Sequence, residues 1–121
     1  PMAELRLSRR AASDLAEIAD YTIAEFGIDQ ARRYRDQLHA CFQSLLANPA
    51  LGRSAEEVTP GLRRIRQQAH VVFYRGERDG VLIVRVLHHS MDFERHLCWY
   101  RVKECFEILD CEFGVFGKLS P

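Results

Sequence analysis

The sequence has no lysine between Met2 and Leu97, no long apolar run and no excess of either charge. No stretch approaches the roughly 18 uninterrupted apolar residues of a membrane helix, and the opening PMAELRLSRR contains no apolar core of a signal peptide. Seventeen Lys and Arg residues balance seventeen Asp and Glu residues, so the whole chain has no net charge to attract nucleic acid or a membrane. We therefore expect a cytoplasmic protein without membrane contact.

Motifs that would indicate a metal or a nucleotide cofactor are also missing. The four cysteines, Cys41, Cys98, Cys105 and Cys111, have neither C-x-x-C nor zinc-ligand spacing. The glycines occur singly, without G-x-G-x-x-G or G-K-[ST]. We expect no metal and no cofactor.

The composition changes near residue 97. The chain of 121 residues is long enough for one domain, and its 47 % hydrophobic content is typical of a globular protein. All five histidines precede this point, whereas the lysines, Lys103 and Lys118, follow it. We predict a domain over residues 1–97 and a C-terminal extension over 98–121. The extension is either docked on the body through its aromatic side chains or a late addition without a selected role.

Apolar periodicity predicts a pair of helices in the first half of the body. Ser8 is a candidate N-cap, Gly27 ends the first helix, Asp29 caps the second, and Asn48-Pro49 stops it. The short connection predicts an antiparallel hairpin. The first helix has an apolar face formed by Ala12, Leu15, Ala19, Ile23 and Phe26. The apolar face of the second helix is formed by Ala31, Tyr34, Leu38, Cys41, Phe42, Leu45 and Leu46. Outer positions such as Asp14 and Glu17 are expected in solvent.

Runs of β-branched and aromatic residues predict the strands. Leu5 and Leu7 suit a short opening strand, residues 50–61 form a loop, and strands follow at 62–68, 71–75 and 81–88. Asp79-Gly80 supplies the positive φ angles of a tight hairpin. The fold class is α+β, in the order β-α-α-β-β-β, with a helical hairpin on one face of a small, mainly antiparallel twisted sheet, the other face remaining open.

One group of arginines is a candidate binding surface. Alternation places Arg64 and Arg66 on one face of their strand and Arg63 on the other. Guanidinium groups bind carboxylates and phosphates in bidentate fashion, so this group is a hypothesis for target binding. A solvated sheet face with local acidic partners is the alternative. The predicted target-binding residues are Arg63, Arg64, Arg66, Arg85 and Arg95.

The body resembles the ParE branch of the ParE/RelE toxin superfamily. The similarity covers Met2 to about Leu97 and depends on four motifs in order: N-P-x-x-G from Asn48, P-G-L-R from Pro60, F-Y-R from Phe73, and V-L-H-x-S-M-D ending at Asp92. The resemblance implies a toxin of a bacterial type II toxin-antitoxin system, neutralised by a ParD-like antitoxin in a hetero-oligomer. ParE-branch members are understood to act on DNA gyrase, whereas RelE-branch members cut messenger RNA on the ribosome.

The residue content favours the gyrase branch. Metal-free RNA cleavage needs a base, cationic donors and an acid, and the body has neither lysine nor a late tyrosine for these roles. We therefore expect no catalysis. The alternative, a ribosome-dependent endonuclease, would use His89, His88 and Arg85, although neighbouring strand residues such as His88 and His89 are expected to point to opposite faces. A module that binds antitoxin but has lost toxicity is a third possibility.

The resemblance also implies where the antitoxin binds. We expect an amphipathic helix and a following extended segment of the antitoxin beside Leu15, Ile18 and Leu38 and along a sheet edge. Sequence-specific binding of operator DNA is expected of the antitoxin and not of this chain.

Overall fold

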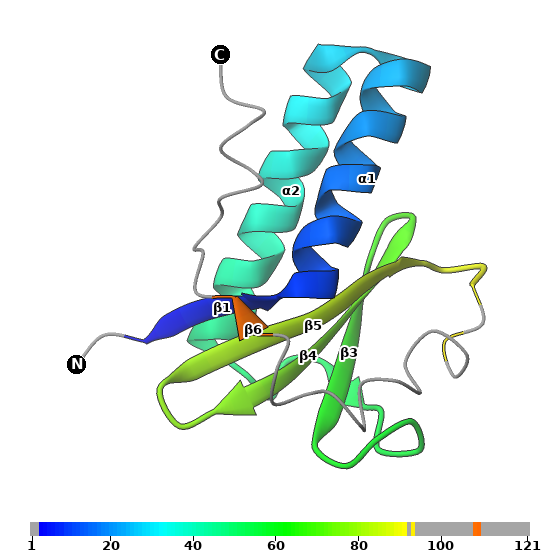
Figure 1. Cartoon of the computed structure of the whole chain (residues 1–121). Coiled ribbons are helices and arrows are strands. Elements are labelled where there is room, and N and C mark those ends of the chain that lie inside the picture. Colours follow the sequence, from blue (N-terminus) through cyan, green and yellow to red (C-terminus); the bar gives the residue numbers. More distant parts are fainter. Residues whose placement is uncertain (1–2, 92, 94–107, 110–121) are drawn as a thin grey trace.

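The computed structural model describes residues 3–91, 93 and 108–109. In chain order the elements are β1 (Glu4–Ser8), α1 (Arg9–Phe26), α2 (Ile28–Ala47), β2 (Arg53–Ser54), β3 (Leu62–Gln67), β4 (His70–Glu77), β5 (Gly80–His88) and β6 (Ile108–Leu109). The two helices form an antiparallel hairpin on one side of the sheet (Figure 1). The predicted α+β class and element order are confirmed, with β2 and β6 as additions.

The sheet is mixed, with strand order β2-β3-β4-β5-β1-β6. β1 and β5 are parallel, and every other neighbouring pair is antiparallel. β5, which is apolar apart from Arg85 and its last residue His88, lies inside the sheet between β4 and β1, and apolar clusters cover both of its faces. β6 pairs with β1 through Leu7 and Ser8, so this part of the C-terminal extension is hydrogen-bonded to the sheet. The rest of the extension lies outside the described residues.

Ser8 and Gly27 set the ends of α1. The Ser8 hydroxyl accepts a hydrogen bond from the Ala11 amide at 3.0 Å and donates one to the Val84 carbonyl at 2.7 Å, so the cap also ties α1 to β5. Gly27 has φ +90°, donates its amide to Ile23 and accepts from the amide of Ala31. The predicted Asp29 cap is wrong: one glycine serves both helix ends, and Asp29 lies within the first turn of α2.

The predicted apolar face of α1 is correct only in its first half. Leu15 is buried, but Ile23 is 36 % and Phe26 65 % exposed, because the tip of the hairpin extends past the sheet. Asp14, expected in solvent, is buried instead. The α2 face is confirmed from Ala31 to Leu45.

Buried apolar side chains lie on both faces of the sheet, so the predicted open face is wrong. One cluster packs the helices against the sheet, and the second lies on the far face around Phe73, Leu82 and Val84. A register shift between Phe73 and Tyr74 leaves two β5 residues opposite Phe73. This irregularity makes Ile83 and Val86, three positions apart, both face the helices.

The β4–β5 turn differs from the predicted one. Glu77 pairs with Gly80, so the loop residues are Arg78 and Asp79, and Asp79 does not have positive φ. Gly80 has φ +157°, and a Cβ there would lie 1.9 Å from the Glu4 carbonyl oxygen. Glycine is thus required for the close approach of β1 rather than for the turn.

Within the described part of the chain, no helix is long and apolar enough to span a membrane.

Candidate functional site

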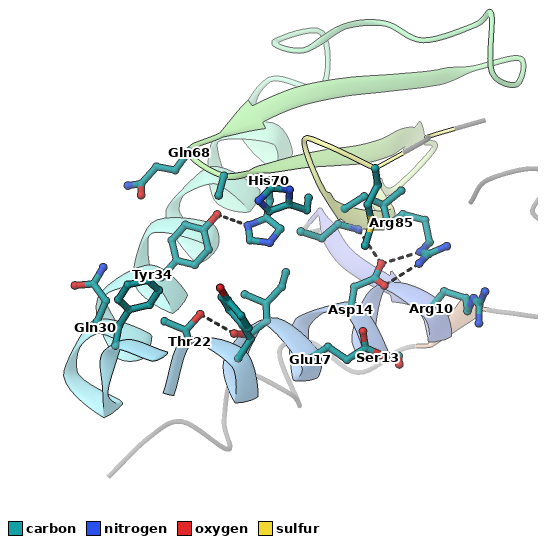
Figure 2. A pocket seen from close by; sticks show the side chains of 18 of the residues that line it. Arg10, Ser13, Asp14, Glu17, Thr22, Gln30, Tyr34, Gln68, His70 and Arg85 are labelled. Atoms are coloured by element: carbon teal, nitrogen blue, oxygen red, sulfur yellow. Dashed lines mark hydrogen bonds and ion pairs between the residues drawn. The ribbon is translucent and has the colours of Figure 1, made fainter. Parts of the chain in front are cut away.

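A groove of about 950 Å³ runs between α1, the start of α2, the β3–β4 turn and the end of β5 (Figure 2). Its exposed apolar side chains are Tyr21, Phe26 and Met91, at 63 %, 65 % and 43 % exposure. Arg10 and Arg33 also line it. A groove with exposed apolar side chains and polar residues around them is typical of a protein-binding site and suits an amphipathic helix.

A buried ion pair joins α1 to β5 at one end of the groove (Figure 2). Arg85 donates through Nε to Asp14 Oδ2 at 2.7 Å and through Nη2 to Oδ1 at 2.9 Å. Asp14 Oδ2 also accepts the Val86 amide at 2.9 Å. The side chains are 7 % and 11 % exposed, so Arg85 is not part of the exposed basic surface that we predicted.

Tyr34 and His70 form a second polar contact, where the groove meets the β3–β4 turn. The Tyr34 hydroxyl donates to the Gln67 carbonyl at 3.0 Å and lies 2.6 Å from His70 Nδ1. A hydroxyl has one proton, so we infer that His70 Nδ1 carries hydrogen and donates to the Tyr34 oxygen. Burial raises the pKa of Tyr34 to about 12. Burial, and then the nearby His88 and His89, lower the pKa of His70 to about 4.

His88 lines the groove and His89 lines a separate pocket, as strand alternation predicted, but the two side chains are not held apart. Their rings stack with centroids 4.5 Å apart and an interplanar angle of 28°. This contact is possible because β5 ends at His88 and a turn begins. His88 Nδ1 lies 2.7 Å from Ser90 Oγ, and its ring contacts His70 edge to face at 5.6 Å. Among the described residues, no cluster of three or more His, Cys, Asp or Glu is placed to hold a metal ion.

A basic pocket of about 450 Å³ contains Arg53, Arg64, Arg66 and His89. Arg64 and Arg66 pair with Phe73 and Val71, which belong to the cluster on the far side of the sheet from the helices. Arg63 points the other way, as predicted, and donates to the carbonyls of Gly52 and Ala50. Of the five predicted target-binding arginines, the structure therefore brings only Arg64 and Arg66 together, and Arg95 lies outside the described residues.

The predicted antitoxin contacts need a similar correction. Leu15 and Leu38 are 3 % and 1 % exposed and belong to the core, so a partner cannot reach them. Ile18 is partly buried and does line the groove. Sequence periodicity could not separate the buried and partner-facing parts of one apolar stripe. Tyr21 was not predicted from the sequence as a groove residue. An aromatic residue outside the apolar stripe was the signal that could have indicated it.

Known proteins give the context for these surfaces. A family model described as ParE toxin of type II toxin-antitoxin system, parDE, matches residues 5–93. The chain belongs to the ParE toxin family. A "Toxin ParE1" of Caulobacter vibrioides is 42 % identical over 97 residues, which cover 79 % of this chain and 99 % of that ParE.

A second relative and a solved structure agree with this assignment. A "Toxin ParE1" of Mycobacterium tuberculosis is 40 % identical over 92 residues, 75 % of this chain and 94 % of the relative. A solved structure titled "Chromosomal ParDE TA system from P. aeruginosa" matches with a TM-score of 0.62 at 25 % identity, covering 72 % of this chain and 96 % of that one. The resemblance to ParE and the toxin-antitoxin role are thereby confirmed.

Proposed function

We propose that this ParE family member inhibits DNA gyrase in the cytoplasm by surface contact, without catalysing a reaction, and is neutralised by a ParD-like antitoxin. Membership of the ParE family is the observation that carries this proposal. The family places the chain in a toxin-antitoxin pair, and the groove provides a surface for the antitoxin.

The groove beside α1 suits an antitoxin helix followed by an extended segment. Tyr21, Phe26 and Met91 offer apolar side chains at the tip of the hairpin and beyond the end of β5. Arg10 and Arg33 offer positive charge along the same surface. A matching partner has an apolar helical face flanked by carboxylates, because guanidinium groups pair with carboxylates.

The residues available for RNA cleavage support a non-catalytic mechanism. Arg85 is held by Asp14, away from solvent. With a pKa of about 4, His70 is neutral near pH 7 and is a poor proton donor there. No lysine occurs between Met2 and Leu97.

A purified gyrase assay tests the proposal. The toxin is made by cell-free translation from a premade messenger RNA and mixed with gyrase, supercoiled plasmid and ATP. Gyrase poisoning predicts linear DNA released by denaturant. Folded toxin with no effect on supercoiling or linear DNA would contradict it. A variant lacking residues 98–121 is assayed in parallel to show whether the extension contributes.

A messenger-RNA endonuclease is the second candidate, and the stacked His88 and His89 next to the basic pocket favour it. Such an enzyme would stop its own cell-free synthesis, whereas a gyrase inhibitor would not. In this case His89→Ala would restore protein synthesis and remove new 5′ ends from the RNA. If neither activity is found while antitoxin still binds, the chain is the non-toxic module.

A further inference from the structure

The basic pocket on the far side of the sheet places like charges against one another. Arg53 of β2 is the registered partner of Arg64 of β3. Directly opposed like charges on neighbouring antiparallel strands are destabilising. Arg66 follows two positions along β3, on the same face as Arg64.

The guanidinium groups of this pocket have few acceptors in the described part of the chain. Arg64 Nε is buried without a hydrogen-bond partner, and Arg64 Nη2 is 3.7 Å from the exposed Glu57 carboxylate. Arg66 Nε donates to the Gln68 carbonyl. No hydrogen bond or ion pair joins the Arg53 side chain to another described residue. Among the described residues, the pocket therefore has more donors than acceptors.

The fourth member of the pocket, His89, is affected by the same charges. Desolvation, followed by the positive charges of Arg66 and His88, lowers its pKa. The rest of the lining is apolar, with Leu51, Val71 and Phe93 beside the charged groups. A volume of about 450 Å³ falls within the usual range of ligand sites, roughly 300–1,000 Å³.

We infer that the pocket of Arg53, Arg64, Arg66 and His89 binds the phosphodiester backbone of DNA without reading its sequence. A phosphate accepts hydrogen bonds from two guanidinium groups at once and relieves the repulsion between Arg53 and Arg64. The apolar lining suits the sugar that follows the phosphate. The anion site rests on this geometry alone, whereas the choice of DNA rests on the proposed action on gyrase, which holds cleaved DNA.

The test measures binding of the full chain to a fluorescent single-stranded DNA, its duplex and an RNA of equal length by anisotropy, over a range of KCl concentrations. The test variant combines Arg64→Gln with Arg66→Gln. The control combines Arg9→Gln with Arg78→Gln, which removes the same charge from exposed positions outside the pocket. A third variant, Arg64→Lys with Arg66→Lys, keeps the charge and removes the bidentate geometry.

We expect the test variant to bind DNA at least tenfold more weakly at 0.1 M KCl, with a slope of log affinity against log salt that is smaller by about two. The control should stay within twofold of the parent, and the lysine variant should retain the salt slope. Circular dichroism melting establishes that all variants are folded. No DNA binding, equal loss in test and control, or at least tenfold tighter binding of RNA than of DNA would each overturn the inference.

The gyrase assay separates this inference from the proposed function. Gyrase trapping by a toxin that does not bind DNA would leave the proposed function standing and remove the DNA site. DNA binding through the pocket without any effect on gyrase would support the site and contradict the proposed function.

Discussion

Replacing Asp14 with alanine should destabilise the fold more than any other single charge removal on α1. Asp14 accepts two hydrogen bonds from the Arg85 guanidinium and one from the Val86 amide. The substitution removes the carboxylate opposite a buried cation and deprives a buried amide of its acceptor. Removing one partner of a buried ion pair costs about 3–5 kcal/mol of unfolding free energy.

This loss is large for a domain of this size, since small domains are stable by about 5–15 kcal/mol. With a denaturant slope of about 2 kcal/mol/M, the urea midpoint should fall by about 1.5–2.5 M. Glu17→Ala is the matched control, because Glu17 is an exposed carboxylate one turn further along α1. It should shift the midpoint by less than about 0.3 M.

A double variant separates the charge from the packing. Asp14→Leu with Arg85→Met replaces the pair with apolar side chains and should recover most of the stability lost in Asp14→Ala, since such replacements are often neutral or stabilising. Urea unfolding followed by circular dichroism measures all four proteins. A loss of less than about 1 kcal/mol in Asp14→Ala would refute the reasoning, because Arg85 would then be compensated without Asp14.

Three further predictions concern the groove, the loop after α2 and the pH dependence. Phe26→Glu should abolish rescue by a ParD-like antitoxin in a growth assay while toxicity persists, because Phe26 is 65 % exposed; Ile28→Glu, exposed outside the groove, is the control and should be rescued. Tyr74→Phe should cost about 1–3 kcal/mol in urea unfolding, because the buried Tyr74 hydroxyl accepts the Gly52 amide at 2.7 Å and donates to Pro49; an unchanged midpoint would count against this contact. The pKa of His70 is lowered from 6.5 to about 4 in the folded state, so protonation favours unfolding and stability should fall as pH decreases from about 6.5 to 4, by roughly 1–2 kcal/mol after solvent screening. His70→Gln should lose this pH dependence, and a parallel decline in both proteins would contradict the assignment.

The local signals in the sequence predicted the fold well because each has a local cause. Ser8 caps α1 through its own side chain, and Gly27 ends it with a positive φ. The N-P-x-x-G motif also has a structural reason: a Cβ on Gly52 would lie 2.6 Å from both the Arg64 carbonyl oxygen and the Tyr74 hydroxyl. Asn48, Pro49 and Gly52 therefore bring the chain from α2 against Tyr74.

The site was predicted less well because its geometry depends on contacts between distant residues. Asp14 and Arg85 are 71 positions apart. Helical periodicity assigns Asp14 to the outer face of α1, so it does not indicate that this carboxylate pairs with a buried guanidinium. Leu15 and Tyr21 lie on the same helix, yet one packs in the core and the other lines the groove, because the sheet ends between them. Arg53 was missed because β2 is a two-residue strand that only its pairing with β3 defines.

The groove and the basic pocket are lined by two consecutive residues of the chain, and this limits which variants can distinguish the two surfaces. His88 lines the groove and His89 lines the pocket, and their rings stack at 4.5 Å. A substitution at either histidine removes a ring that supports the other, so it changes both surfaces. Loss of toxicity in His89→Ala alone would therefore not separate catalysis from DNA contact or antitoxin binding. Phe26 and Arg64 each touch one surface only, and variants at these two positions are the ones that assign a function to each.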